Sequence, residues 1–269
     1  MALFLGGLIL GLASLLAVLL MEGGSLGALI GPSAFVLAVL GPFGATLMGA
    51  GQQDVRNLPK ALAIAMKGRT PDADAVITLL GRFADRARKE GMLVLESEVA
   101  EVEDHFLQTG LQLVVDGVDG DHVRGVLEAE LDAMRERHHA LIKFFHTMAG
   151  FAPIFGLMGT IVGIVGVMGQ LEEPADLGHG IALALLGVLY GVLFGNLVYL
   201  PIANKLERLH NLETEARRLT LEGILAIREG MSARLLVERL EARLAPERRV
   251  GHQQRFGQAV AEATHEEVA

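Results

Sequence analysis

Four stretches of this chain consist almost wholly of apolar residues and contain no Asp, Glu, Lys or Arg. They are residues 1–21, 26–51, 151–170 and 180–203. A helix needs about 20 consecutive apolar residues to cross the hydrocarbon core of a bilayer, and each stretch meets this length. The pattern therefore predicts four transmembrane helices.

The polar segments between and after these spans show helical periodicity. Apolar side chains recur every three or four residues in 51–146 and again in 205–244, which is the spacing of one helix face. In the first segment they fall at Val55, Leu58, Leu62, Ala65 and Met66, at Val76, Leu79, Leu80 and Phe83, and at Val126, Leu127, Leu131 and Met134. After Pro246 the composition becomes polar, so we expect a flexible end over 247–269.

Together these patterns predict an all-α membrane protein with four transmembrane helices, a helical cytoplasmic domain between the second and third, and a helical C-terminal tail. The expected organisation is a transmembrane hairpin at 1–51, a cytoplasmic helical domain at 52–147, the third and fourth spans at 148–203, and a cytoplasmic helix with a flexible tail at 204–269.

The distribution of positive charge predicts the orientation. All 23 Lys and Arg residues lie within 56–143 and 205–255, and none lies in the loops around 22–31 and 171–179. Loops rich in Lys and Arg stay in the cytoplasm, so both blocks and both termini are expected there. The net charge of −9, with acids and bases interspersed, argues against a nucleic-acid partner. The absence of cysteine excludes disulfides and thiolate metal sites.

The predicted spans lack any ionisable side chain of the kind that marks an ion path at membrane depth. If the protein moves ions, the titrating carboxylate must come from a partner's helix. Thr160, Tyr190 and Tyr199 are polar groups inside the third and fourth spans, and Thr160 is expected to bond the carbonyl four residues earlier. Pro153 and Pro201 stand at the cytoplasmic ends of these spans, as kinks or as hinges.

Glycines recur at four-residue intervals in three of the spans, at Gly7 and Gly11, at Gly159 and Gly163, and at Gly187, Gly191 and Gly195. Such stripes let helices approach closely. Packing of the chain against itself is sufficient to explain the first pair, Gly7 and Gly11. The stripes on the third and fourth spans indicate a role beyond packing within the chain. They favour an assembly of several copies or a smooth surface along which another helix moves.

Seven segments, in order along the chain, resemble the MotA/TolQ/ExbB proton-channel family, and within it the flagellar stator subunits. The most specific are APIFGLMGTIVG at 152–163 and YG at 190–191 followed by GNLVYLPIANKL at 195–206. The others are 7–13 with 44–47, 87–96, 106–117, 134–138, and 222–227 with 229–230.

This resemblance implies a stator subunit of the bacterial flagellar motor in the inner membrane, acting as part of a channel and not as an enzyme. Such subunits form a ring, thought to be a pentamer, around the helices of a MotB-like dimer that is anchored to peptidoglycan. A membrane Asp of that partner carries the ion, which would supply the missing carboxylate. Membrane lipid is the other expected contact, and no cofactor is implied.

The resemblance also assigns residues to the ion path. Pro153 and Pro201 match the prolines on which coupling depends, and Thr160 matches a hydroxyl that faces the ion. Gly187 and Val188, just before Tyr190, stand where sodium-type stators carry threonines. Because Na⁺ needs several oxygen ligands and a proton needs only a carboxylate and a water path, their loss favours protons.

On the cytoplasmic side, Arg88 and Glu96 match the charged pair that engages oppositely charged residues of the rotor protein FliG. Glu130 stands where the family has another functionally sensitive acid, and a solvated helix face explains it equally well. Arg86 is expected to be simply solvated, as are Arg82 and Lys89.

Three other classes compete with this interpretation. A TolQ/ExbB-type energiser has three spans with its long insertion after the first, which the order of segments here disfavours. A stator-like unit that drives gliding or phage defence would have the same spans, so it stays an alternative. A membrane enzyme is least favoured, because no Ser/His/Asp, metal-ligand or phosphate-cradling pattern is present.

Overall fold

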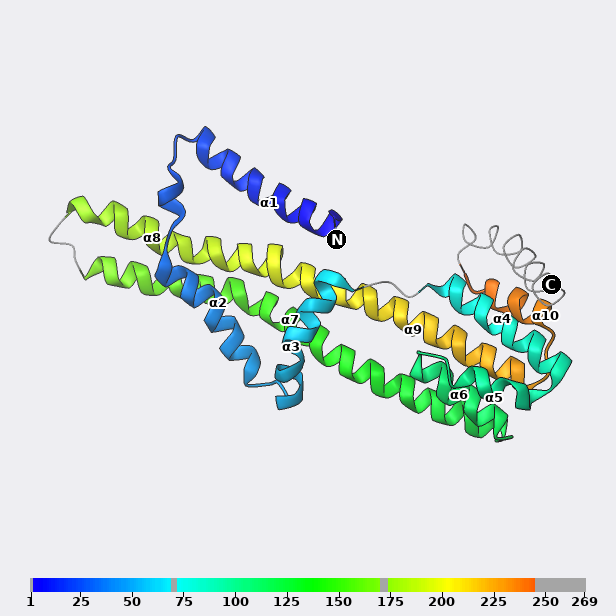
Figure 1. Cartoon of the computed structure of the whole chain (residues 1–269). Helices are drawn as coiled ribbons and strands as arrows, with labels where there is room; N and C mark the ends of the chain where they lie inside the picture. The colour runs from blue at the N-terminus through cyan, green and yellow to red at the C-terminus, as the bar shows by residue number, and fades with distance from the viewer. Residues whose placement is uncertain (1, 69–71, 170–173, 245–269) are drawn as a thin grey trace. The chain divides into compact units, whose positions relative to one another are not determined.

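The computed structural model describes residues 2–68, 72–169 and 174–244, and every element in them is helical (Figure 1). The all-α prediction is therefore confirmed. The predicted flexible end at 247–269 lies outside the described residues. The chain forms two compact units, unit 1 from Met1–Arg69 with Glu136–His210, and unit 2 from Thr70–Arg135 with Asn211–Ala269.

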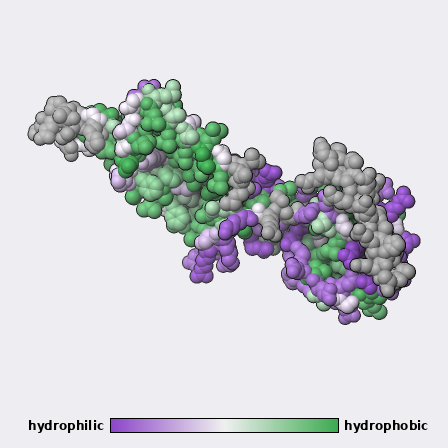
Figure 2. All heavy atoms as spheres, turned by 45° about the horizontal axis from the view of Figure 1, so that its top comes forward, coloured by the Kyte–Doolittle hydropathy of each residue, from purple (hydrophilic) through white to green (hydrophobic). Residues whose placement is uncertain are grey.

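Unit 1 contains the four predicted spans. They lie in α1 (Ala2–Met21), in η1 (Leu26–Leu29) with α2 (Pro32–Leu47), in α7 (Gly120–Met168), and in α8 (Pro174–Leu193) with its continuation. All four helical stretches are long and apolar enough to cross a membrane. Apolar side chains dominate the visible surface of this unit (Figure 2). The prediction of four membrane helices is confirmed.

Two helices extend well beyond their predicted spans. In α7, 49 residues long, the end of the periodic segment predicted up to residue 146 continues into the span predicted at 151–170 without a break, even though Pro153 lies inside. The fourth span continues from α8 through one stretch of π-helix, η3 (Phe194–Tyr199), into α9 (Leu200–Arg228). The sequence predicted the spans and the polar helices as separate elements, because the exposed faces of α7 and α9 change from apolar to polar where the charge-free stretches end.

The short helix α3 (Gln52–Lys67) packs across α7 and α9 in unit 1. It buries Ala61 and Ala65 against a cluster formed by Ile142, Phe145, Ile202, Ala203 and Leu206. The prediction of one apolar face here was partly wrong, because Leu62 and Met66 are 41% and 45% exposed.

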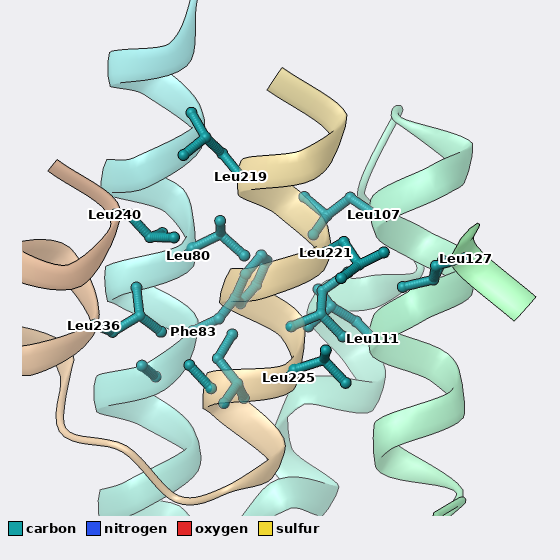
Figure 3. Close-up of a cluster of buried hydrophobic side chains, with 14 of the residues drawn as sticks. Leu80, Phe83, Leu107, Leu111, Leu127, Leu219, Leu221, Leu225, Leu236 and Leu240 are labelled. Carbon is teal, nitrogen blue, oxygen red and sulfur yellow. The ribbon is translucent and has the colours of Figure 1, made fainter. Parts of the chain in front are cut away.

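Unit 2 has its own core, drawn in Figure 3. Its helices are α4 (Ala73–Glu90), η2 (Met92–Val94), α5 (Leu95–Val99), α6 (His105–Val115), α10 (Ala233–Glu241) and the polar parts of α7 and α9. The fully buried side chains at its centre include Ile77, Leu80, Phe106, Leu111, Leu127, Ile224 and Leu236. A helical domain with a closed apolar core is the result.

Glycine at position 230 explains why the apolar stripe predicted over 205–244 splits into two helices. Gly230 has φ +71, a left-handed conformation that ends α9, and the Met231 amide donates back to the Ala226 carbonyl at 3.0 Å. Ser232 then caps α10. The turn lets α10 return to pack against α4.

Candidate functional site

The site predicted on the third and fourth spans centres on a close seam between α7 and α8. A Cβ atom added to Gly156 would lie 2.5 Å from the Gly187 carbonyl oxygen, and one added to Gly191 would lie 2.5 Å from the Ala152 carbonyl oxygen. Gly163 faces Ala184 in the same way. Backbone therefore touches backbone, which is what stripes of small residues permit in membranes.

This seam corrects one expectation from the sequence. The glycine stripes of α7 and α8 were predicted to serve an assembly of copies or a sliding surface, yet Gly163, Gly187 and Gly191 face the chain's own neighbouring helix. The outward face of α7 instead carries large apolar side chains, among them Ile154, Leu157, Met158, Ile161 and Val165. These side chains form an exposed apolar face of α7.

Gly11 on α1 packs against the Leu197 side chain, as the interpretation of the first glycine pair predicted. The same prediction is wrong for Gly7, because an added Cβ there has no atom within 4 Å among the residues that the structure describes. Gly159 faces the Leu37 side chain of α2.

Thr160 lies in the seam and is 6% exposed. Its hydroxyl is 3.2 Å from the Gly156 carbonyl oxygen, the contact four residues earlier that the sequence predicted, and 2.8 Å from the Ala184 carbonyl oxygen of α8. Because a hydroxyl has one proton to donate, these two acceptors compete for it. Thr160 thus links the two helices by a polar contact at membrane depth.

The two predicted coupling prolines lie in different local structures. Pro153 has no amide proton to offer the Ala149 carbonyl, and that oxygen lies 3.0 Å from where a Cβ of Gly195 would be. Pro201 lies two residues after the end of the π-helix, where the Leu200 amide donates to the Gly195 carbonyl five residues back. A wide turn is one of the known ways in which a helix accommodates a missing donor.

Tyr190 faces the segment between α1 and α2. Its hydroxyl donates to the Leu29 carbonyl and accepts a hydrogen bond of 3.3 Å from the Gly31 amide. Its ring lies edge-on to Phe35 of α2 and to Phe194. Tyr190 therefore holds η1 and the start of α2 against α8, whereas Val188 is half-buried.

A shallow groove of about 340 Å³ lies beside the seam, where α2 meets α7 and α8. It is lined by Ser33, Ala34, Leu37 and a series of glycines that includes Gly159, Gly166 and Gly180. Its lining side chains include no ionisable group.

Sequence reasoning passed over Asn196. Its side chain is exposed on η3, inside an apolar span, and its amide nitrogen donates to the Val192 carbonyl at 3.0 Å. An exposed amide in a membrane helix is costly when it faces lipid. The sequence contained the information, because Asn196 is the asparagine of the motif at 195–206 that lies within the charge-free stretch 180–203.

The predicted rotor residues all lie in unit 2. Arg88 is exposed in the last turn of α4, Glu96 is exposed on α5, and Glu130 is half-buried on α7. Gly91, with φ +93, ends α4 between the first two. Arg88 and Glu96 take part in no hydrogen bond or ion pair within the described ranges 2–68, 72–169 and 174–244, so both charges face outward.

Arg86 was expected to be simply solvated, and this was wrong. Its guanidinium pairs with the half-buried Glu98 carboxylate of α5, and it also lies 3.5 Å from Glu90. Lys89 pairs with Asp85 at 2.8 Å. The Arg86–Glu98 pair ties α4 to α5, whereas the neighbouring Arg88 is left for contacts outside the chain.

Comparison with known proteins agrees with this arrangement. The model of the MotA/TolQ/ExbB proton channel family matches residues 98–218. Motility protein A of Borreliella burgdorferi is 35% identical over 217 residues, which are 81% of this chain and 84% of that protein. Chemotaxis protein PomA of Vibrio alginolyticus is 34% identical over 230 residues, which are 86% of this chain and 90% of that protein.

A solved structure also matches along nearly the whole chain. The flagellar MotAB stator complex from Bacillus subtilis contains a chain that superposes with a TM-score of 0.85 at 28% identity, covering 91% of this chain and 97% of that one. The fold of the chain is thus shared with that structure. The chain belongs to the MotA/TolQ/ExbB proton channel family.

Proposed function

We propose that this chain is a stator subunit of a bacterial flagellar motor, which forms an ion channel with a MotB-like partner and turns ion flow into torque on the rotor. The observation that carries the proposal is that the membrane-spanning parts of α7 and α8 pack into a wall that contains no acidic side chain. Residues 151–169 and 180–203 contain no Asp, Glu, Lys or Arg. The relatives named Motility protein A and the MotAB complex support the same role.

The ion-carrying carboxylate then belongs to the partner, a single-span protein that binds peptidoglycan and acts as a dimer. This chain surrounds it as a homo-oligomer, which we propose to be a pentamer in the inner membrane with both termini in the cytoplasm. The outward apolar faces of α1, α2 and α7 contact lipid, copies of the chain and the partner.

Movement of one charge through 100 mV releases about 2.3 kcal/mol, enough to bias a conformational step in the wall around the acid. Pro153 and Pro201 are the proposed points of bending, since each removes a backbone hydrogen bond from a helix of the wall. Thr160 is proposed to control that movement, because it can exchange its hydrogen bond between α7 and α8.

In unit 2, the unpaired charges of Arg88 and Glu96 are the proposed contacts with a FliG-like rotor protein, with Glu130 nearby in the same unit. Exposed ion pairs are weak, which suits contacts that form and release at every step. The transported ion is proposed to be the proton, because Gly187 and Val188 offer no hydroxyl ligands for Na⁺.

Proton flux into liposomes tests the proposal. The purified chain alone should conduct no measurable current, and the chain co-reconstituted with its partner should conduct protons. The partner variant whose membrane Asp is changed to Asn is the control and should abolish the current. A robust flux through the chain alone would contradict the proposal.

A further inference from the structure

Helix α3 has two different faces. One packs against the rest of unit 1 through Ala61 and Ala65, which are buried against α7 and α9. The other is exposed and carries both cations and large apolar side chains. A helix of this kind buries only part of its surface inside its own chain, and the remainder is available to another surface.

The cations of α3 form a row. Arg56, Lys60 and Lys67 are spaced by four and seven residues, so they lie on the same side of the helix, and all three are exposed. Over the described part of the chain none of them has an ion pair or a side-chain hydrogen bond. Asp54 is the acid of this helix, and its carboxylate accepts from the Gly51 amide at the N-terminus at 3.2 Å. The row is therefore not neutralised by its own helix.

Large apolar side chains are exposed on another side of the same helix. Leu62 and Met66, one turn apart, are both exposed, and the helical period places them on a different side of α3 from the row of cations. Cations on one side and large apolar residues on another are the pattern of a helix that lies in the interface of a membrane, with apolar side chains among the acyl chains and cations at the headgroups.

The position of α3 agrees with this pattern. It begins five residues after α2 ends, and it packs on α9 at Ile202 and Ala203, where the fourth charge-free stretch ends. Figure 1 shows α3 crossing α7 and α9 instead of running beside them. Because α7 and α9 continue the membrane spans, a helix that crosses them at this level lies near the plane of the bilayer surface.

We propose that α3 lies on the cytoplasmic leaflet and binds anionic phospholipids, with phosphate oxygens accepting hydrogen bonds from Arg56, Lys60 and Lys67. Leu62 and Met66 insert among the acyl chains. Charge complementarity selects the occupant, since anionic lipid attracts clustered cations near the membrane surface and neutral lipid does not. The proposal rests on the membrane placement of the chain and not on its role as a channel.

The chain contains no tryptophan, so the fluorescence of one introduced tryptophan reports on a single position. In the full chain reconstituted into bilayers, the fluorescence of the Leu62→Trp variant should be quenched more strongly by brominated phosphatidylglycerol than by brominated phosphatidylcholine at equal mole fraction. We expect about fivefold enrichment of the anionic lipid, the effect of one engaged cation. The preference should fall with added salt. It should vanish when Arg56→Gln, Lys60→Gln and Lys67→Gln are added together.

A matched control removes three exposed cations of unit 2, Arg82→Gln, Arg218→Gln and Arg234→Gln, and should leave the lipid preference unchanged. Met66→Trp repeats the measurement if Leu62→Trp fails to fold. Leu10→Trp on α1 reports insertion into the bilayer and should be quenched by both lipids.

Equal quenching of Leu62→Trp and Met66→Trp by the two lipids would overturn the anionic preference. No quenching by either lipid, with Leu10→Trp still quenched, would mean that a second copy of the chain covers this face, and the proposal would be wrong while the membrane placement stood.

Discussion

At the scale of single residues, Gly191 occupies the tightest part of the seam. A Cβ there would lie 2.5 Å from the Ala152 carbonyl oxygen and 2.9 Å from the Gly156 Cα, both backbone atoms that cannot turn aside. We expect Gly191→Ala to force α7 and α8 apart and to cost about 1–3 kcal/mol, the usual range for overpacking. Thermal unfolding in detergent should show the loss.

Gly150→Ala on α7 is the matched control, because among the described residues an added Cβ there meets no atom of a neighbouring element within 4 Å. It should leave the melting temperature unchanged or raise it, since alanine favours helix over glycine. Equal melting temperatures for the two variants would mean that the seam is looser than its geometry indicates.

Substitution of Thr160 can distinguish a role in helix packing from a role in the ion path. Thr160→Val keeps the shape of the side chain and removes the hydroxyl, so the contact with the Ala184 carbonyl is lost. Interhelical hydrogen bonds in membranes average about 0.6 kcal/mol, so the melting temperature should fall only slightly. If the hydroxyl also controls the ion path, proton flux through the complex should fall much further, and Thr160→Ser should restore it.

Sequence reasoning reached these residues through their spacing and through family resemblance, but it could not say where they point. Thr160 was correctly predicted to contact Gly156, because that contact is local. Its bond to Ala184, 24 residues away, depends on how two helices pack. For the same reason the contacts of Tyr190 with Leu29 and Gly31, which lie between α1 and α2, were not predicted.

At the scale of elements, α4 carries two arginines with different roles two residues apart. Charge reversal at Arg88, which is exposed and unpaired, should leave folding within about 0.5 kcal/mol of the parent, as is typical of surface sites. It should reduce swimming by repelling the rotor protein, and a compensating reversal on the rotor should restore it. Arg82→Glu, also exposed on α4, is the control for charge alone.

Arg86→Glu should behave differently, because it breaks the pair with Glu98 that ties α4 to α5. A lower melting temperature of the chain is expected, and no reversal on the rotor should rescue it. If Arg88→Glu fails to assemble, or resists rescue in the same way, the proposed rotor surface is wrong.

The elements themselves were largely predictable, since long stretches without charge and strong helical periodicity depend on local sequence alone. Their boundaries were less so. The continuity of α7 through Pro153 was not visible, because a proline ordinarily suggests a break. Arg86 was misjudged because its partner Glu98 lies on another helix.

At the scale of the whole molecule, the missing hydroxyls at Gly187 and Val188 lead to a test of ion choice. Swimming driven by this stator should follow the proton gradient and should not change when external Na⁺ is replaced by K⁺ at constant pH and membrane potential. A relative with threonines at these positions, assayed in the same cells, is the positive control for sodium dependence. Loss of swimming on sodium removal would contradict the prediction.

Assembly was the least predictable property. A residue such as Val165 or Leu185 is apolar and exposed whether it faces lipid, a copy of the chain or the partner's helix. Hydrophobicity does not distinguish these surroundings, since lipid tails are as apolar as leucine. The glycine stripes suggested copies, and their use within the chain became clear only from the seam.

The π-helix at Phe194–Tyr199 has a consequence for how such a chain can evolve. A π turn holds one residue more than an α turn, and each residue of an α-helix advances the helix face by about 100°. Deleting one residue within η3 would restore a regular helix and keep every flanking side chain. Because the π turn takes up its extra residue within one turn, the deletion would leave the glycines of α8 facing nearly the same way relative to Ile202 and Ala203. A single-residue deletion inside η3 should therefore be tolerated better than one in the regular parts of α8 or α9, where each lost residue rotates the flanking faces by about 100°.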